Sequence, residues 1–238
     1  MNILGFIPAR AGSKRLPDKN IRVLGDNPLI TYTIAASLAA RNITRTIVST
    51  DSREIASISL SSGADVPFMR PMELAQSHST EMEFFLHALD WLKKNESYVP
   101  DLIVLLYPTS PFRKAESIDR AIRLMLQHPE ADSLRSIRMC SEHPYKMWQI
   151  DERGYLRPFV KTGDTCTQTL STQLFPMVYI QNASIYITKP STILNKQSPI
   201  GDIVIPFIMD DIESTDINTL FDFKCAEMIL NENKKASS

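Results

Sequence analysis

Short apolar runs alternate with helical patterns along the first half of the chain. The strand-like runs are 3–7, 46–49 and 102–106, and the last is continuous, as in strands buried on both faces of a sheet. The helical patterns occupy 29–40, 53–61, 80–89 and 118–125, and Thr80 with Glu83 has the spacing of a capping box. Such alternation requires crossover connections between strands. The sequence therefore predicts an α/β fold with a doubly wound, mostly parallel sheet.

The pattern changes after about residue 135. The stretch 136–180 is richer in turn residues, aromatics and polar side chains, which indicates a lobe of short strands and loops inserted into a single domain, 1–238. Strand-like runs return at 184–188 and 203–208. A closing helix is predicted over 218–230, and the polar tail 231–238 is expected to be frayed.

The composition is that of an ordinary globular protein. The 238 residues are 43% hydrophobic and carry a formal net charge of -1, which offers no global basic field for a nucleic acid. The three cysteines have no metal-ligand spacing and suit a reducing compartment. The apolar run at the N-terminus is too short for a signal peptide or a membrane span. We therefore expect a cytoplasmic protein without nucleic-acid or membrane partners.

The loop after the first predicted strand is the most informative stretch. Its chemistry-bearing residues are Arg10, Gly12, Ser13, Lys14, Arg15 and Lys19. Open α/β sheets place their ligands at the carboxyl ends of strands, and cations beside free backbone N–H groups bind polyphosphate. The loop is neither a Walker A nor a dinucleotide-binding motif, because Gly12 stands alone. The alternative interpretation is a solvated basic loop.

This loop also carries a family resemblance. The run Ile-Pro-Ala-Arg-Ala-Gly-Ser-Lys-Arg-Leu-Pro-Asp-Lys-Asn, from Ile7 to Asn20, resembles the signature loop of the CMP-N-acetylneuraminate synthetases and their cytidylyltransferase relatives. Further matches follow in the same order at Ser49-Thr50-Asp51, Arg70-Pro71, Pro108-Thr109-Ser110-Pro111-Phe112-Arg113, His143-Pro144-Tyr145-Lys146, Gln181-Asn182-Ala183-Ser184-Ile185-Tyr186 and Asp216-Ile217-Asn218. The resemblance therefore covers nearly the whole chain.

The resemblance implies an enzyme that joins CTP to the anomeric hydroxyl of an acidic sugar and releases pyrophosphate with the help of Mg²⁺. In such a reaction a hydroxyl attacks the α-phosphorus while negative charge grows on the leaving pyrophosphate. Fixed cations and a metal ion lower this barrier, and no covalent nucleophile is needed. The resemblance also implies a homodimer formed through the inserted lobe.

Carried over position by position, the resemblance assigns roles to named residues. Nucleotide binding falls to Pro8, Ala9, Arg10, Gly12, Ser13, Asn20 and Arg70. Catalytic roles fall to Arg10, Lys14, Lys19 and Asp216. Sugar binding falls to Tyr107, Thr109, Ser110, His143, Lys146, Gln173 and Asn182, with His143 and Lys146 reaching the partner's site. Metal binding falls to Asp216 and Asn218.

Several of these residues have competing interpretations. Asp216 is equally suited to cap the closing helix, and Asp210 and Asp211 are rival metal ligands. The Thr109–Ser110 hydroxyls suit a rigid turn, and Asn182 suits a turn before the following strand.

Three positions depart from the family pattern. Asn218 stands where the family has a second aspartate, Tyr107 where sialic-acid enzymes have Gln, and Thr172 where many members have Arg. The last two fall at positions expected to touch the sugar. The sequence therefore predicts a sugar such as legionaminic or pseudaminic acid as readily as N-acetylneuraminate.

Other functions remain open at this stage. An octulosonate or another nucleotide such as GTP would keep the reaction. Two further alternatives have a different activity: a sugar-nucleotide-dependent glycosyltransferase, or a non-catalytic nucleotide-binding regulator.

Overall fold

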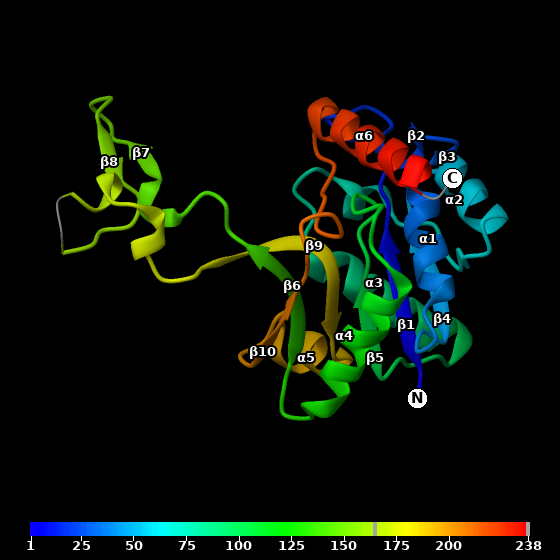
Figure 1. The fold of residues 1–238 in the computed structure, drawn as a ribbon. Helices are drawn as coiled ribbons and strands as arrows, with labels where there is room; N and C mark the ends of the chain where they lie inside the picture. The colour runs from blue at the N-terminus through cyan, green and yellow to red at the C-terminus, as the bar shows by residue number, and fades with distance from the viewer. Residues whose placement is uncertain (164–165, 237–238) are drawn as a thin grey trace.

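The computed structural model describes residues 1–163 and 166–236, and its centre is a six-stranded sheet (Figure 1). In sheet order the strands are β10 (Val204–Ile208), β6 (Ser133–Met139), β9 (Tyr179–Thr188), β5 (Leu102–Leu105), β1 (Ile3–Pro8) and β4 (Arg45–Ser49). The β9 strand runs antiparallel to β5 and β6, and the other neighbours are parallel. The predicted α/β fold with a mostly parallel sheet is confirmed.

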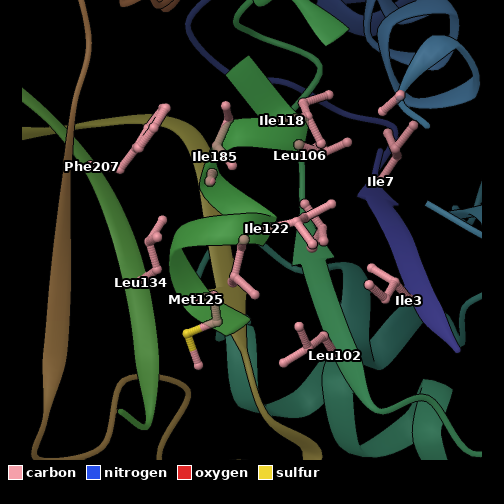
Figure 2. Packing of buried hydrophobic residues seen from close by; sticks show 14 of the residues in the cluster. Ile3, Ile7, Leu102, Leu106, Ile118, Ile122, Met125, Leu134, Ile185 and Phe207 are labelled. Carbon is pink, nitrogen blue, oxygen red and sulfur yellow. The ribbon is translucent and has the colours of Figure 1, made fainter. Parts of the chain in front are cut away.

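Helices cover both faces of the sheet because successive strand residues point to opposite sides. On one face, Ile3 and Ile7 of β1 pack with residues of three helices in a single core cluster (Figure 2). These helices are α1 (Leu29–Ala39), α2 (Arg53–Ser61) and α4 (Ala115–Gln127). On the other face, Leu4 and Phe6 pack with α3 (Glu81–Glu96) and α5 (Pro190–Lys196).

The predicted start of α3 is confirmed. The Thr80 hydroxyl accepts from the Glu83 amide, and the Glu83 carboxylate accepts from the Thr80 amide at 2.5 Å, which is a complete capping box. Phe84 then stacks on Phe6 with ring centroids 5.5 Å apart. This places the first turn of α3 beside the carboxyl end of β1.

The closing helix α6 (Leu220–Ala236) lies over the first loop, residues 9–20 after β1, and over the small ribbon of β2 (Val23–Leu24) and β3 (Asn27–Pro28) (Figure 1). A third core cluster joins Phe223 of α6 to Leu16 of the loop. The prediction of a frayed tail is wrong for residues 231–236, which continue the helix. Their Glu, Lys and Ala residues are good helix formers, and lysines suit the negative end of a helix. Residues 237–238 lie outside the described residues.

The segment between β6 and β9 projects from the sheet body (Figure 1). Its elements are η3 (Pro144–Lys146), β7 (Trp148–Ile150), β8 (Leu156–Pro158), η4 (Thr167–Thr169) and η5 (Thr172–Leu174). The ends of β6 and β9 pair as far as Met139 and Tyr179, so the strands extend into the predicted lobe 136–180. Of that range, 164–165 lie outside the described residues. None of the helices in 1–163 and 166–236 has the length and hydrophobicity needed to cross a bilayer.

Candidate active site

The first loop, residues 9–20, follows β1 at the carboxyl edge of the sheet. Two backbone amides tie it to the segment after β4. The Ala9 amide donates to the Ser49 carbonyl at 2.9 Å, and the Ala11 amide donates to the Asp51 carboxylate at 2.8 Å. The Ser-Thr-Asp motif singled out by the resemblance therefore supports the loop.

A cavity of about 240 Å³ lies beside this loop, and we name it the loop pocket. Six of the predicted nucleotide-binding or catalytic residues line it: Pro8, Arg10, Ser13, Lys19, Asn20 and Arg70. The pocket thus gathers three cations at the carboxyl end of β1. This is the local cationic cluster that a polyphosphate requires in a protein of nearly neutral net charge.

Arg70 is buried and held rigidly at the wall of the loop pocket. Its Nε donates to Ser49 Oγ at 3.0 Å, its Nη2 donates to the Ser49 carbonyl at 2.6 Å, and its guanidinium lies over the Phe84 ring. Burial lowers the pKa of Arg70 to about 10, so the side chain remains a cation at neutral pH. The single N–H of Nε is used by Ser49, whereas Nη1 makes no hydrogen bond within the described residues and its N–H groups remain for a ligand.

Asn20 fixes the start of the first loop. It is buried, and its side-chain amide donates to the Arg10 carbonyl at 2.9 Å. The Arg10 guanidinium is half-buried and donates to the Gly12 carbonyl at 3.3 Å. Gly12 has a φ of 65°, a left-handed conformation that strains any residue with a Cβ. The local chain path therefore needs this glycine.

Lys19 lies deeper than the other cations of the first loop. Its ammonium donates to the Ile217 carbonyl at 3.0 Å and to Asn218 Oδ1 at 3.4 Å. Burial is the main cause that lowers its pKa; Arg15 and Arg10 add to the effect, while Asp216 opposes it. Lys19 is thus a desolvated cation at the contact between the first loop and the segment before α6.

The remaining residues predicted in the first loop lie elsewhere. Ala9 is buried, and Gly12 lines a smaller cavity that also involves Ser52. Lys14 is exposed and lines neither of these cavities, in contrast to Lys19. The structure therefore separates two lysines that the sequence treats alike.

A second cavity, of about 730 Å³, lies beyond Lys19, and we name it the acidic pocket. Its carboxylates come from Asp211, Asp216 and Asp222. Asp216 Oδ1 is buried without a hydrogen-bond partner in the described part of the chain. Because an unpartnered buried carboxylate oxygen is costly, this atom is suited to accept a cation or a ligand donor.

The cap of α6 is made by residues other than Asp216. Asp222 Oδ2 accepts from the amides of Asn218 and Thr219 at 2.9 and 2.7 Å, and Thr219 Oγ1 accepts from the Asp222 amide at 3.2 Å. The interpretation of Asp216 as a helix cap is therefore wrong. Its carboxylate remains available to the acidic pocket.

Asn218 is engaged on both sides of its amide. Its Nδ2 donates to Asp216 Oδ2 at 2.5 Å, while its Oδ1 accepts from Lys19 and from Arg15, the latter at 3.1 Å. A metal ligand role for Asn218 would require Oδ1 to exchange these cationic donors for the metal. In the described residues no group of three or more His, Cys, Asp and Glu side chains is arranged to hold a metal. A Mg²⁺ ion at Asp216 would thus need oxygens from its substrate, as Mg²⁺ commonly does.

Tyr107 lines the loop pocket, but its hydroxyl is directed at a carboxylate. It donates to Glu81 Oε1 at 2.8 Å, and Arg135 Nη2 donates to Glu81 Oε2 at 3.2 Å. Burial and the neighbouring Glu81 raise the pKa of Tyr107, so the hydroxyl stays protonated. What Tyr107 offers the pocket is therefore the ring.

The other predicted sugar-binding residues of the sheet body occupy different depths. Thr109 lines the loop pocket, and its carbonyl accepts from the Ile217 amide at 2.9 Å, which joins the turn after β5 to the acidic pocket. Ser110 is fully buried and donates to the Ala183 carbonyl at 3.4 Å. Asn182 lines the acidic pocket.

The predicted sugar-binding residues of the lobe line neither pocket. His143 and Gln173 line a separate cavity of the lobe, and Lys146 is exposed. The His143 ring accepts from the Tyr145 amide through Nδ1 and donates to the Pro176 carbonyl through Nε2 at 3.0 Å. Both ring nitrogens are therefore occupied within the lobe.

Sequence reasoning missed several pocket residues. Glu81 lines the loop pocket with Ser77 and Ser79, and Arg138 lines the acidic pocket. Glu81 had a usable signal, because it follows the predicted helix cap at the carboxyl edge of the sheet. Arg138 had none, because its position depends on how β6 pairs with β9.

Comparison with known proteins places this site in a family. The model of the cytidylyltransferase family matches residues 4–199. The chain belongs to the cytidylyltransferase family. It is therefore a nucleotidyltransferase, and the resemblance seen in the sequence is confirmed.

Relatives cover nearly all of this cytidylyltransferase. It is 35% identical over 240 residues to the CMP-N,N'-diacetyllegionaminic acid synthase of Legionella pneumophila, with 99% of each chain covered. It is 32% identical to the N-acylneuraminate cytidylyltransferase of Escherichia coli, covering 94% of this chain and 51% of that one. A solved structure of CMP:2-keto-3-deoxy-manno-octonic acid synthetase complexed with CTP has a TM-score of 0.71 at 13% identity, covering 98% of this chain and all of that one, and shares the fold.

Proposed function

We propose that this cytidylyltransferase transfers CMP from CTP to the anomeric hydroxyl of a nonulosonic acid and releases pyrophosphate. One observation carries the proposal. The Lys19 ammonium lies in the loop pocket and contacts Asn218 of the acidic pocket, so the α-phosphate of a nucleotide held by the first loop would lie beside Asp216. A sugar in the acidic pocket, with its tail extending to Tyr107 and Thr109 of the loop pocket, would then present its hydroxyl to the α-phosphorus.

The first loop would provide the electrostatic part of catalysis. Arg10 and Lys19 would bind the phosphates, with Ser13 as an additional donor. Fixed cations that meet the charge growing on the leaving pyrophosphate stabilise the transition state more than the ground state. Asn20 and Arg70 would hold the nucleoside part against the wall of the loop pocket.

Mg²⁺ is part of the proposal. Asp216 would hold the ion through the buried Oδ1, which has no hydrogen-bond partner in the described residues. The ion would supply positive charge near the α-phosphate and the leaving group. In the absence of a second carboxylate at Asn218, the ammonium of Lys19 would provide further charge at the same place.

The lobe would form a homodimer, and its Lys146 would reach the partner's site. In support, the lobe exposes large apolar side chains, including Trp148, Ile150, Tyr155 and Phe159 at exposed fractions of 47, 73, 64 and 61%. Apolar surface of this extent marks an interaction site. Lys146 belongs to η3 of the same segment and lines neither the loop pocket nor the acidic pocket.

We further propose that the enzyme works in the cytoplasm, since Cys140 and Cys225 are thiols that a reducing compartment preserves.

Pyrophosphate release tests the proposed reaction. The enzyme is incubated with CTP, UTP, GTP or ATP, with or without N-acetylneuraminate, N,N'-diacetyllegionaminate, pseudaminate or an octulosonate. Pyrophosphate should appear only when CTP and a nonulosonic acid are both present. Release without a sugar, or only with the octulosonate, would contradict the proposal.

A further inference from the structure

The acidic pocket concentrates negative charge, and an anionic substrate would add to the repulsion. Its three carboxylates, from Asp211, Asp216 and Asp222, surround a cavity proposed to accept an anionic sugar. A substrate carboxylate brought among like charges is disfavoured unless a cation meets it. Among the described residues that line this pocket, the only Lys or Arg is Arg138.

Arg138 lies on β6 and lines the acidic pocket. It lies opposite Ile180 of β9, two residues after the buried Ser136, which sits at a shift in the pairing register between Arg135 and Ile137. Ser136 Oγ donates to Asn182 Oδ1 at 2.5 Å, and Asn182 Nδ2 donates to Ser214 Oγ at 2.8 Å. This buried chain of hydrogen bonds lies beneath the pocket and fixes the strand that carries Arg138.

The Arg138 guanidinium has unused donors. It is half-buried and makes one hydrogen bond, from Nη1 to the Met139 carbonyl at 3.2 Å. No ion pair to it occurs within the described residues, although three aspartates line the same pocket. Nε and Nη2 thus remain for a planar, two-oxygen acceptor, which a guanidinium binds in a bidentate fashion.

We infer that Arg138 binds the carboxylate of the acidic sugar and is a specificity-determining residue of this enzyme. The inference rests on the proposed function. It also bears on Thr172, which stands where many family members have an arginine. Here a guanidinium is supplied from β6 of the same chain that carries Asp216.

Kinetics of Arg138→Gln and Arg138→Lys test this role, with Arg53→Gln as a matched control. Arg53 is an exposed arginine at the start of α2 and lines none of the described cavities. Loss of a charged hydrogen bond should raise KM for the sugar acid about 10- to 100-fold in Arg138→Gln, while KM for CTP stays unchanged. Arg138→Lys should recover part of the loss, and Arg53→Gln should behave as wild type.

A substrate analogue separates carboxylate binding from a structural role. The wild-type enzyme should use the sugar acid better than its methyl ester, and Arg138→Gln should lose most of this preference. An unchanged preference in a variant that binds CTP normally would overturn the inference. So would equal losses for CTP and sugar. If Arg138→Gln does not fold, the preference for the acid over the ester in Arg138→Lys decides.

The experiments distinguish a failure of the proposed reaction from a failure of the proposed role of Arg138. A wild-type enzyme that releases no pyrophosphate with any nonulosonic acid would overturn both proposals. An active wild type with an unaffected Arg138→Gln would overturn only the role of Arg138.

Discussion

The ammonium of Lys19 and the amide oxygen of Asn218 lie 3.4 Å apart, and this contact joins the two pockets of the enzyme. Lys19 belongs to the first loop and Asn218 to the segment before α6, so the contact bridges the two ends of the chain. In relatives of the expected pattern a carboxylate stands at the position of Asn218. Burial lowers the pKa of Lys19, and the neutral amide of Asn218 adds no charge that would oppose this shift.

Removal of either central cation should reduce turnover strongly. Lys19→Ala and Arg10→Ala each take away a charge that would meet the developing pyrophosphate, and we expect kcat to fall about 10²- to 10³-fold. Lys93→Ala, which removes an exposed lysine from the end of α3, should have no effect. Steady-state pyrophosphate release measures all three variants. Near-normal rates in both loop variants would show that the first loop does not bind the phosphates.

The lowered pKa of Lys19 predicts how kcat/KM for CTP falls at alkaline pH. As pH rises through this pKa the free enzyme loses a phosphate-binding charge, so kcat/KM for CTP should fall at a lower pH than an ordinary lysine would cause. Lys19→Arg keeps its charge at these pH values and should shift the fall to higher pH. A pH profile of kcat/KM that is identical in both enzymes would contradict this role.

The lowered pKa of Lys19 makes stability change with pH in the opposite direction to kcat/KM. In the pH range between the folded and unfolded pKa values of Lys19, the unfolded chain binds more protons than the folded one. The contribution of Lys19 to stability therefore rises with pH through the folded pKa. Melting temperatures measured along the pH profile check that the fall in rate is not caused by unfolding.

Asp216 and Asn218 should respond differently to substitution. Asp216→Asn removes the carboxylate of the proposed metal site and should abolish the Mg²⁺-dependent rate. Asn218→Asp should lower the Mg²⁺ concentration for half-maximal rate, because a hard divalent ion prefers carboxylate oxygen. Asp90→Asn on the surface of α3 is the control. Full activity in Asp216→Asn would move the metal site to Asp210 or Asp211.

The lobe should be required for dimerisation. Glutamate at both Ile150 and Leu156, which are 73 and 58% exposed, places charges on the apolar face of the hairpin. We expect light scattering to show a dimer for the wild type and a monomer for this double variant, with reduced turnover because Lys146 no longer reaches a partner. Leu60→Glu, on exposed α2, should remain dimeric. A wild-type monomer would refute the proposed dimer.

The first loop shows which parts of the site can be predicted from sequence. Its cations are adjacent in the chain and follow a recognisable strand, so their meeting depends only on local geometry. How deeply each cation is buried, however, depends on contacts with distant parts of the chain. Lys14 and Lys19 carry the same group, yet only Lys19 is covered by the segment of Ile217, and that contact depends on α6 folding back over the loop.

The acidic pocket shows what sequence reasoning could not reach. Asp216 and Asp222 both suit a helix N-terminus, and only the observed hydrogen bonds assign the cap to Asp222. Arg138 enters the pocket because β6 pairs with β9, which are separated by the whole lobe. Long-range strand pairing leaves no local pattern around such a residue.

The last prediction concerns the sugar. We expect CTP as the preferred nucleotide and a nine-carbon acid other than N-acetylneuraminate as the preferred sugar. Tyr107 replaces an amide that both donates and accepts, and its hydroxyl is directed at Glu81 rather than into the loop pocket. Thr172 lacks the guanidinium of many relatives. Both changes leave less hydrogen bonding for a glycerol tail and suit a deoxygenated, methyl-ended tail.

Variants of Tyr107 and a comparison of sugars decide this point. An apolar surface rejects an added hydroxyl only moderately, so kcat/KM should favour legionaminic or pseudaminic acid over N-acetylneuraminate by about 10- to 100-fold. Tyr107→Phe should keep the preference, because it retains the ring and loses only the hydroxyl bound to Glu81. Tyr107→Gln should shift the preference toward N-acetylneuraminate, since an amide can hydrogen-bond its tail. A wild-type preference for N-acetylneuraminate would contradict the interpretation that Tyr107 and Thr172 disfavour a glycerol tail. It would leave the cytidylyltransferase assignment intact.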